Sequence, residues 1–193
     1  PAYWIDTVEL TFDLDPAKTR VLNRMTLRRN ADVAAQPLRL DGEELNLARV
    51  LVNGQGTSFK MDGGQLLLET LPDTGIFTLE IFTTCAPAKN TKLMGLYVSN
   101  ESFFTQCEAE GFRRITYFLD RPDVMASYTV TLRADKAKYP VLLSNGNLVV
   151  FARLAVEADH LLAGGLVAAG HDACLDRGEA PLRPDHALGG DAL

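Results

Sequence analysis

Residues 3–15 have the sequence YWIDTVELTFDLD, in which apolar and polar residues alternate over most of the stretch. Successive side chains of a β-strand point to opposite faces, so this alternation predicts a strand with one buried and one solvent-exposed face. The turn-forming residues Asp15-Pro16-Ala17-Lys18 follow, and alternation resumes from Thr19 to Arg29. The two stretches are predicted to form an antiparallel hairpin whose bend is capped by Asp15.

Strand-like segments continue along the chain at short intervals. We predict further strands at residues 37–40, 47–52, 58–61, 65–71, 77–84, 128–134 and 141–143. Turn-forming pairs such as Asp41-Gly42 and Asn53-Gly54 separate them. A turn of helix is expected only within residues 112–119. The pattern predicts a mostly β fold, an antiparallel saddle-like β-sandwich over residues 1–149, with an irregular or partly helical C-terminal tail.

The composition excludes several classes of protein. The chain has 193 residues, of which 47% are hydrophobic and 23% are charged, and its net charge is -6. These values are typical of one globular domain with a tail. Nucleic-acid binding is not expected, because it depends on clustered lysine and arginine. No apolar run of about 18 residues and no signal-peptide pattern occurs, so we expect a cytoplasmic protein that does not enter a membrane.

The cysteines are Cys85, Cys107 and Cys174, and they form no Cys-x-x-Cys pair. An unmatched set of this kind is typical of a reducing compartment, so we predict thiols and no disulfide framework. A lone cysteine without a paired histidine is more often a small buried hydrophobe than a nucleophile. We assign Cys107 to that structural role.

The composition changes abruptly near residue 149. Residues 150–193 contain no Lys, Ser, Thr, Asn, Gln, Tyr or Trp, and they hold all the histidines. One interpretation is an amphipathic helix over residues 154–169, interrupted by Gly164-Gly165 and followed by an irregular tail. The other is an out-of-frame translation that is poorly ordered. We favour the second, because adjacent glycines cost a helix about 2 kcal/mol relative to alanine.

Acidic residues crowd the segment from Thr105 to Glu110. If this segment is extended, the two-residue period places Gln106, Glu108 and Glu110 on one face. Like charges on one face repel, so a cation is expected beside them, either an arginine of the chain or the ammonium group of a ligand. The candidate arginines are Arg113, Arg114 and Arg121. The residues alone favour an arginine, because such ion pairs are common in proteins.

Distinctive runs of sequence surround this segment. They are Gly95-Leu96-Tyr97, TQCEAEGFR at residues 105–113 and YFLDRPDV at residues 117–124. Together they closely resemble the aminopeptidase N (alanyl aminopeptidase) family of zinc metallopeptidases. The similarity extends upstream through LTFDLD at residues 10–15 and PLRLDGEEL at 37–45, and downstream to SNGN at 144–147. It therefore covers residues 1–147.

The resemblance implies a saddle-like β domain packed on a zinc catalytic domain, with the Gln-Cys-Glu strand reaching into the substrate cleft. In this family the glutamine and the first glutamate of that motif contact the free amino end of the peptide. They correspond to Gln106 and Glu108. A carboxylate sheltered from water is a strong acceptor for an ammonium group, so Glu108 is expected to bind substrate, and no residue is assigned a catalytic role. Residues 120–123 (DRPD) are interpreted as a structural turn.

The catalysis of this family requires a His-Glu-x-x-His motif, which the sequence lacks. The histidines are His160, His171 and His186, and their spacing does not match, so no residue is assigned to a metal or a cofactor. We expect an N-terminal domain fragment that is inactive alone, with zinc bound by the rest of the parent enzyme. Its expected partners are a peptide amino terminus and the absent catalytic domain of the same polypeptide.

Other functions remain open at this point. The chain is alternatively a noncatalytic β-sandwich that serves as a binding or interaction module, or a small metal-binding protein that uses Cys174 and the tail histidines. The sequence also departs from the family pattern at residues 148–151. If closing strands are missing there, an exposed sheet edge predicts marginal stability or self-association.

Overall fold

The computed structural model describes residues 1–73, 75–144, 146–147, 151–152 and 160–163. Its elements, in chain order, are β1 (Tyr3–Asp13), β2 (Thr19–Arg29), β3 (Leu38–Asp41), β4 (Asn46–Val52), β5 (Gln55–Gly56), β6 (Lys60–Asp62), β7 (Gln65–Leu68), β8 (Ile76–Cys85), the 3₁₀ helix η1 (Pro87–Lys89), β9 (Gly95–Ser99), β10 (Ser102–Gln106), the 3₁₀ helix η2 (Phe112–Arg114), β11 (Ser127–Asp135), β12 (Phe151–Ala152) and β13 (His160–Ala163). The predicted mostly β fold is confirmed. Within the described ranges, no helix is long and apolar enough to cross a bilayer.

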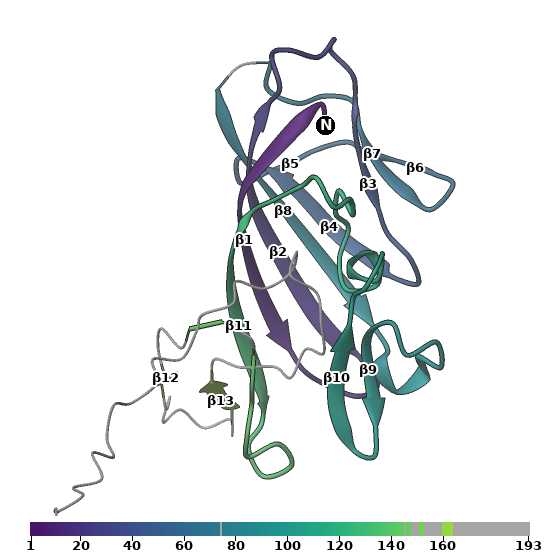
Figure 1. Cartoon of the computed structure of the whole chain (residues 1–193), viewed down its shortest axis with the longest axis vertical. Coiled ribbons are helices and arrows are strands. Elements are labelled where there is room, and N and C mark those ends of the chain that lie inside the picture. The colour runs from purple at the N-terminus through teal and green to yellow at the C-terminus, as the bar shows by residue number, and fades with distance from the viewer. Residues whose placement is uncertain (74, 145, 148–150, 153–159, 164–193) are drawn as a thin grey trace, which may run out of the picture.

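Three sheets are formed by the described strands, and the largest has the order β12-β13-β11-β1-β2-β8-β4-β5. A small sheet has the order β3-β7-β6, and β9 and β10 form a separate hairpin. Figure 1 shows the large sheet running down the molecule, with the small sheet and the hairpin beside it on the right. One hydrophobic core takes buried side chains from the large sheet, from β3 and β7 of the small sheet and from both strands of the hairpin. The small sheet and the hairpin therefore close the inner face of the large sheet.

The predicted N-terminal hairpin is confirmed, because β1 and β2 pair antiparallel from Tyr3 opposite Arg29 to Asp13 opposite Arg20. In the bend, the Asp15 carboxylate accepts hydrogen bonds of 2.8 Å from the backbone N–H groups of Ala17 and Lys18. The pairing of β11 differs from the predicted antiparallel arrangement. It runs parallel to β1, with residues 127–133 opposite residues 7–13, and this needs the long crossover that the intervening chain supplies.

Alternation explains which residues enter the core. Strand β2 buries every second side chain, namely Thr19, Val21, Asn23, Met25 and Leu27. Strand β1 follows the same rule except at a register shift between Ile5 and Thr7, where a bulge accounts for the irregular spacing in its sequence. The thiols of Cys85 and Cys107 are buried, in agreement with the prediction, whereas Cys174 lies outside the described residues.

Several predicted elements differ in the structure. Strand β6 is Lys60–Asp62 in place of residues 58–61, and residues 141–143 are not a strand. Val141 and Leu143 are both exposed, so this short apolar run has no buried face to hold it in a sheet. A helical turn was expected within residues 112–119, and η2 confirms it.

The tail is described only in part. Within residues 154–169, the described segment is strand β13 and not helix, and it pairs with β11 from Leu132 opposite Ala163 to Asp135 opposite His160. The predicted disorder of the rest of the tail, together with His171 and His186, lies outside the described residues.

Candidate functional site

The hairpin β9–β10 carries Gln106 at the end of its second strand, opposite Gly95. Burial alternates along β10: Phe103 and Thr105 are 8% and 4% exposed and face the core, whereas Gln106 is half-buried on the other face. Cys107 follows with a buried side chain, so it points away from the face of Gln106 as predicted. The alternation in the sequence therefore predicted correctly that Gln106 and Cys107 lie on opposite faces.

The predicted extended face of Gln106, Glu108 and Glu110 is wrong. Strand β10 ends at Gln106, and residues 108–110 form a turn. A hydrogen bond of 2.7 Å from the Gly111 N–H to the Cys107 carbonyl oxygen closes the turn. Glu108 and Glu110 are consequently exposed in the turn and are not aligned along a strand. The acidic residues lie at the end of the hairpin, directly after Gln106.

An arginine pairs with part of this acidic segment. The Glu110 carboxylate lies 3.2 Å from the Arg113 guanidinium, which also donates a 2.9 Å hydrogen bond to Asp120. This confirms the predicted arginine partner for Glu110. Asp120 additionally accepts a hydrogen bond from the backbone N–H of Arg113, so it fixes the start of η2 after the turn.

The turn of residues 120–123 has the predicted structural role. Arg121 donates to both carboxylate oxygens of Asp123, over 2.8 and 2.6 Å. The hydrogen bond from Arg121 lowers the pKa of Asp123 below its ordinary value. Both side chains are half exposed, so the pair shapes the turn more than it stabilises the fold.

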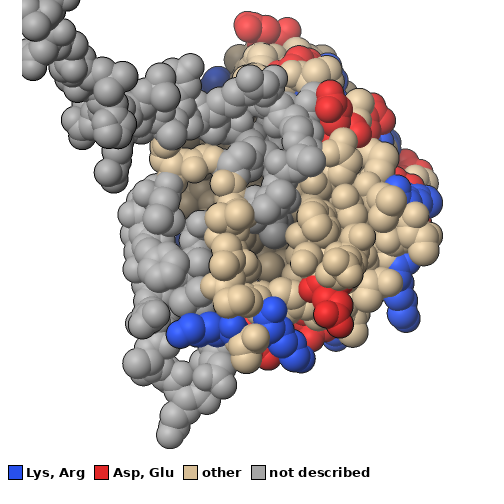
Figure 2. All heavy atoms as spheres, turned by 60° about the horizontal axis from the view of Figure 1, so that its bottom comes forward, with Lys and Arg blue, Asp and Glu red and all other residues tan. Residues whose placement is uncertain are grey.

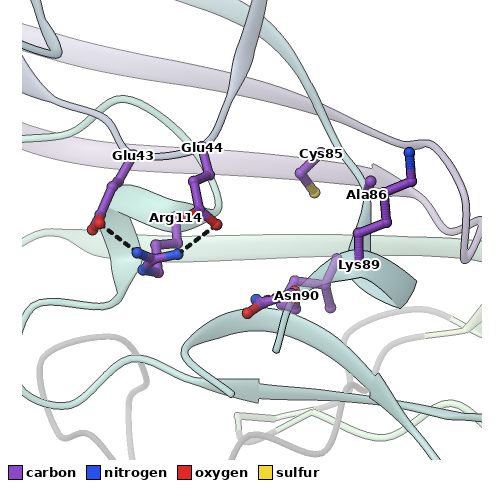
Figure 3. Close-up of a pocket in the computed structure, with 8 residues that line it drawn as sticks. Glu43, Glu44, Cys85, Ala86, Lys89, Asn90 and Arg114 are labelled. Carbon is purple, nitrogen blue, oxygen red and sulfur yellow. Dashed lines mark hydrogen bonds and ion pairs between the residues drawn. The ribbon is translucent and has the colours of Figure 1, made fainter. Parts of the chain in front are cut away.

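Arg114 lines a small pocket. Its side chain is 6% exposed, and its guanidinium is paired with the carboxylates of Glu43 and Glu44 (Figure 3). The bond to Glu44 measures 2.9 Å. The pocket measures about 150 Å³, and Lys89 and Asn90 contribute to its wall. The arrangement joins the loop after β3 to η2, although these segments are distant in sequence.

Lys92 completes this charge cluster. Its ammonium group lies 3.3 Å from Glu43 and 3.1 Å from Glu44. The hydrogen bond from Lys92, and to a smaller extent the one from Arg114, lowers the pKa of Glu44. The hydrogen bond from Lys92 to Glu44 raises the pKa of Lys92. The carboxylates are thus balanced by cations of the same chain, so this pocket braces the fold. Sequence analysis missed it, because no local pattern links residues 43–44 with residue 114.

Gly95 allows η2 to pack against the hairpin. It has a φ of +72°, and a Cβ at this position would lie 2.5 Å from the Cβ of Arg114. Only a residue without a side chain permits this approach. The bracing cluster around Arg114 therefore lies directly beside the strand pair that ends at Gln106.

The end of the molecule that bears the hairpin has a largely uncharged surface. Figure 2 shows uncharged side chains over most of its described area, with acidic and basic groups mainly around the margin. Among the described residues, no cluster of His, Cys, Asp or Glu is arranged to hold a metal ion. The described surface at this end is therefore mainly uncharged.

Comparison with known proteins gives extensive matches. The model of the family described as peptidase M1 N-terminal domain matches residues 6–155. Aminopeptidase N of Escherichia coli strain K12 is 50% identical over 156 residues, and aminopeptidase N of Haemophilus influenzae is 45% identical over 157 residues. Each alignment covers 80% of this chain and 18% of the relative. The chain thus spans less than a fifth of the length of these curated relatives.

Solved structures show the same fold. Aminopeptidase A of Legionella pneumophila, in complex with aspartic acid, is 30% identical with a TM-score of 0.73, over 84% of this chain and 20% of that one. Native yeast LTA4 hydrolase is 15% identical with a TM-score of 0.63, over 84% of this chain and 26% of that one, and this likeness concerns the fold alone.

Proposed function

Because the chain belongs to the peptidase M1 N-terminal domain family, we propose that it is the N-terminal β domain of a zinc-dependent aminopeptidase. In this function, Gln106 and Glu108 bind the free amino group of the peptide from which the enzyme removes the first residue. The domain packs on a catalytic domain that belongs to the rest of the polypeptide. Catalysis itself is assigned to that other part.

The observation that supports this role is the position of Gln106 and Glu108 at the end of the hairpin. The amide oxygen of Gln106 and the carboxylate of Glu108 are acceptors suited to an ammonium group, and the carboxylate forms the stronger, charge-assisted bond. Glu108 is the candidate for the substrate because it is the first glutamate of the motif TQCEAEGFR, which resembles the aminopeptidase N family. Its exposure in the turn makes it accessible to a ligand from outside the chain.

Zinc in such an enzyme polarises the scissile carbonyl and activates a water molecule. The described residues do not fit a zinc site, because they include no suitable cluster of ligands. No catalytic step is therefore assigned to this chain. Its proposed contribution is to bind and orient the amino end of the substrate.

A chimera tests the assignment. Residues 6–155 would replace the matched segment of Escherichia coli aminopeptidase N, and hydrolysis of alanyl-4-nitroanilide would be measured. A hydrogen bond to a charged group contributes about 1.5–3 kcal/mol. We therefore expect Glu108→Gln to lower kcat/KM roughly 10- to 100-fold, and Gln106→Ala to lower it by a smaller factor.

Glu101→Gln is the matched control, because Glu101 is an exposed glutamate of the same hairpin. It should leave kcat/KM unchanged. The proposal is contradicted if Glu108→Gln behaves like Glu101→Gln, or if the chimera folds but is inactive before any substitution. The melting temperature of each variant shows whether a loss of activity reflects unfolding.

A further inference from the structure

The hairpin β9–β10 presents an aromatic pair on the face of Gln106. Phe104 lies two residues before Gln106 in β10, and both side chains are half-buried. Phe103, which precedes Phe104, and Thr105, which lies between Phe104 and Gln106, are buried. Tyr97 of β9 is directly opposite Phe104 in the strand register. The two rings are stacked, with centroids 5.8 Å apart and an angle of 23° between the planes.

This pair lies outside the hydrophobic core. On the opposite face of the hairpin, Phe103 is buried and packs on Tyr139 with ring centroids 4.9 Å apart. Val98, next to Tyr97, also packs against the core. Tyr97 and Phe104 instead contact each other and keep part of their surface exposed to solvent. Partly exposed aromatic rings offer a large apolar contact area to a ligand.

The distance from the aromatic pair to Gln106 suits a substrate side chain. Residues two apart on one strand face are separated by about 7 Å. In the proposed function, the amino group of the peptide is held at Gln106 and Glu108. The side chain of the first residue is attached to the carbon that bears this amino group, so it lies close to the hairpin, and a long side chain spans the distance to the aromatic pair.

We infer that Tyr97 and Phe104 form an apolar contact surface for the side chain of the first residue of the substrate. The site consequently favours peptides that begin with an aromatic or long aliphatic residue over those that begin with alanine. This inference rests on the proposed function of Gln106 and Glu108 and adds a determinant of specificity to the same site.

The chimera described above provides the test, with phenylalanyl- and alanyl-4-nitroanilide as substrates. Tyr97→Ala and Phe104→Ala should each lower kcat/KM for the phenylalanyl substrate about three- to tenfold, since an aromatic contact contributes modestly. The alanyl substrate does not reach the pair, so its kcat/KM should change less than about twofold. Tyr97→Phe keeps the ring and should preserve the preference.

Phe82→Ala is the matched control, because Phe82 is a half-buried aromatic residue on β8 that lies under Arg49. It should leave the ratio of the two kcat/KM values unchanged. An equal loss for both substrates in the Tyr97 and Phe104 variants, or no loss for either, would overturn the inference. If the alanine variants do not fold, Tyr97→Leu and Phe104→Leu keep most of the apolar volume and allow the same comparison.

Failure of the proposed function gives a different result. In that case Glu108→Gln leaves kcat/KM unchanged for both substrates. If Glu108→Gln lowers both values but the aromatic variants do not change their ratio, only the specificity inference fails.

Discussion

Gly111 packs against the main chain of Gln106. A Cβ at Gly111 would lie 2.7 Å from the carbonyl oxygen of Gln106 and 2.8 Å from the Cα of Cys107. Such distances are too short for a real side chain, and the neighbouring atoms are backbone, which does not move aside easily. The missing side chain of Gly111 therefore allows the chain to turn sharply after Gln106 and to present Glu108 beside it.

Gly111→Ala should force this turn open. We expect the free energy of unfolding of the chain to fall by about 1–3 kcal/mol, which is typical of overpacking. Urea unfolding followed by circular dichroism would measure it. Gly56→Ala is the control, because a Cβ at Gly56 meets no atom within 4 Å. Equal stability of the two variants would show that the contact at Gly111 is not tight.

Arg114→Met should destabilise the chain more than Arg24→Met. The side chain of Arg114 is 6% exposed and pairs with two carboxylates, whereas that of Arg24 is 52% exposed and pairs with Glu80. Hydrogen bonds between charged groups contribute about 1.5–3 kcal/mol when buried, and exposed ion pairs at most about 1 kcal/mol. Urea midpoints would compare the two variants. A larger loss for Arg24→Met would contradict the bracing role of Arg114.

Acid should weaken the same cluster. Lys92 and Arg114 lower the pKa of Glu44 below its ordinary value of 4.5. A lowered pKa stabilises the folded state above pH 4.5, and this contribution is lost as the pH falls through the folded pKa. Glu44→Gln should therefore flatten the fall in stability as the pH drops below 4.5. Glu9→Gln, an exposed position on β1, serves as the control, and identical pH profiles for both variants would refute the effect.

The thiol of Cys85 should be unreactive in the folded chain. Burial raises its pKa from 9.0 to about 11, so at pH 9 the folded state holds only about one hundredth as much thiolate as thiol. The same shift means that its contribution to stability declines as the pH rises from 9 to 11. Alkylation with iodoacetamide at pH 9, followed at Cys85 by mass spectrometry, should accelerate strongly in urea. Equal rates with and without urea would show that the thiol is accessible.

Strand β8 offers a test of the core. Leu79 is fully buried, whereas Ile76 on the same strand is 68% exposed. Leu79→Ala should cost about 2–5 kcal/mol of stability through lost burial and a cavity, and Ile76→Ala about 0.5 kcal/mol or less. Thermal or urea unfolding would measure both. A similar loss at the two positions would mean that Leu79 is not part of the core.

Long alternating segments could be predicted from the sequence. The strands predicted at residues 3–15 and 19–29 match the bounds of β1 and β2 closely, because one buried face imposes a period of two on the sequence. The turn at Asp15 could be predicted as well, because its side chain binds the backbone locally. The strand predicted at residues 141–143 was wrong, because a strand needs a neighbouring strand to pair with as well as apolar residues.

The candidate site shows the same limit. Alternation placed Gln106 on the face opposite Cys107. The assumption of an extended chain failed at Glu108, because β10 ends at Gln106 and residues 108–110 form a turn. The pairing of Arg114 with residues 43–44 depends on the tertiary fold and has no local signal. The roles of Gln106 and Glu108 in substrate binding remain predictions from resemblance.

The parallel pairing of residues 7–13 with residues 127–133 also determines the order in which the domain can be completed. During synthesis on the ribosome, β1 can pair with β2 soon after both are made, but it can pair fully with β11 only after residue 133 has left the exit tunnel. Until then, one side of β1 keeps its backbone groups unpaired and able to join another nascent chain. Closure between such distant segments is slow, so we expect the pairing of β1 with β11 to be a late step of folding.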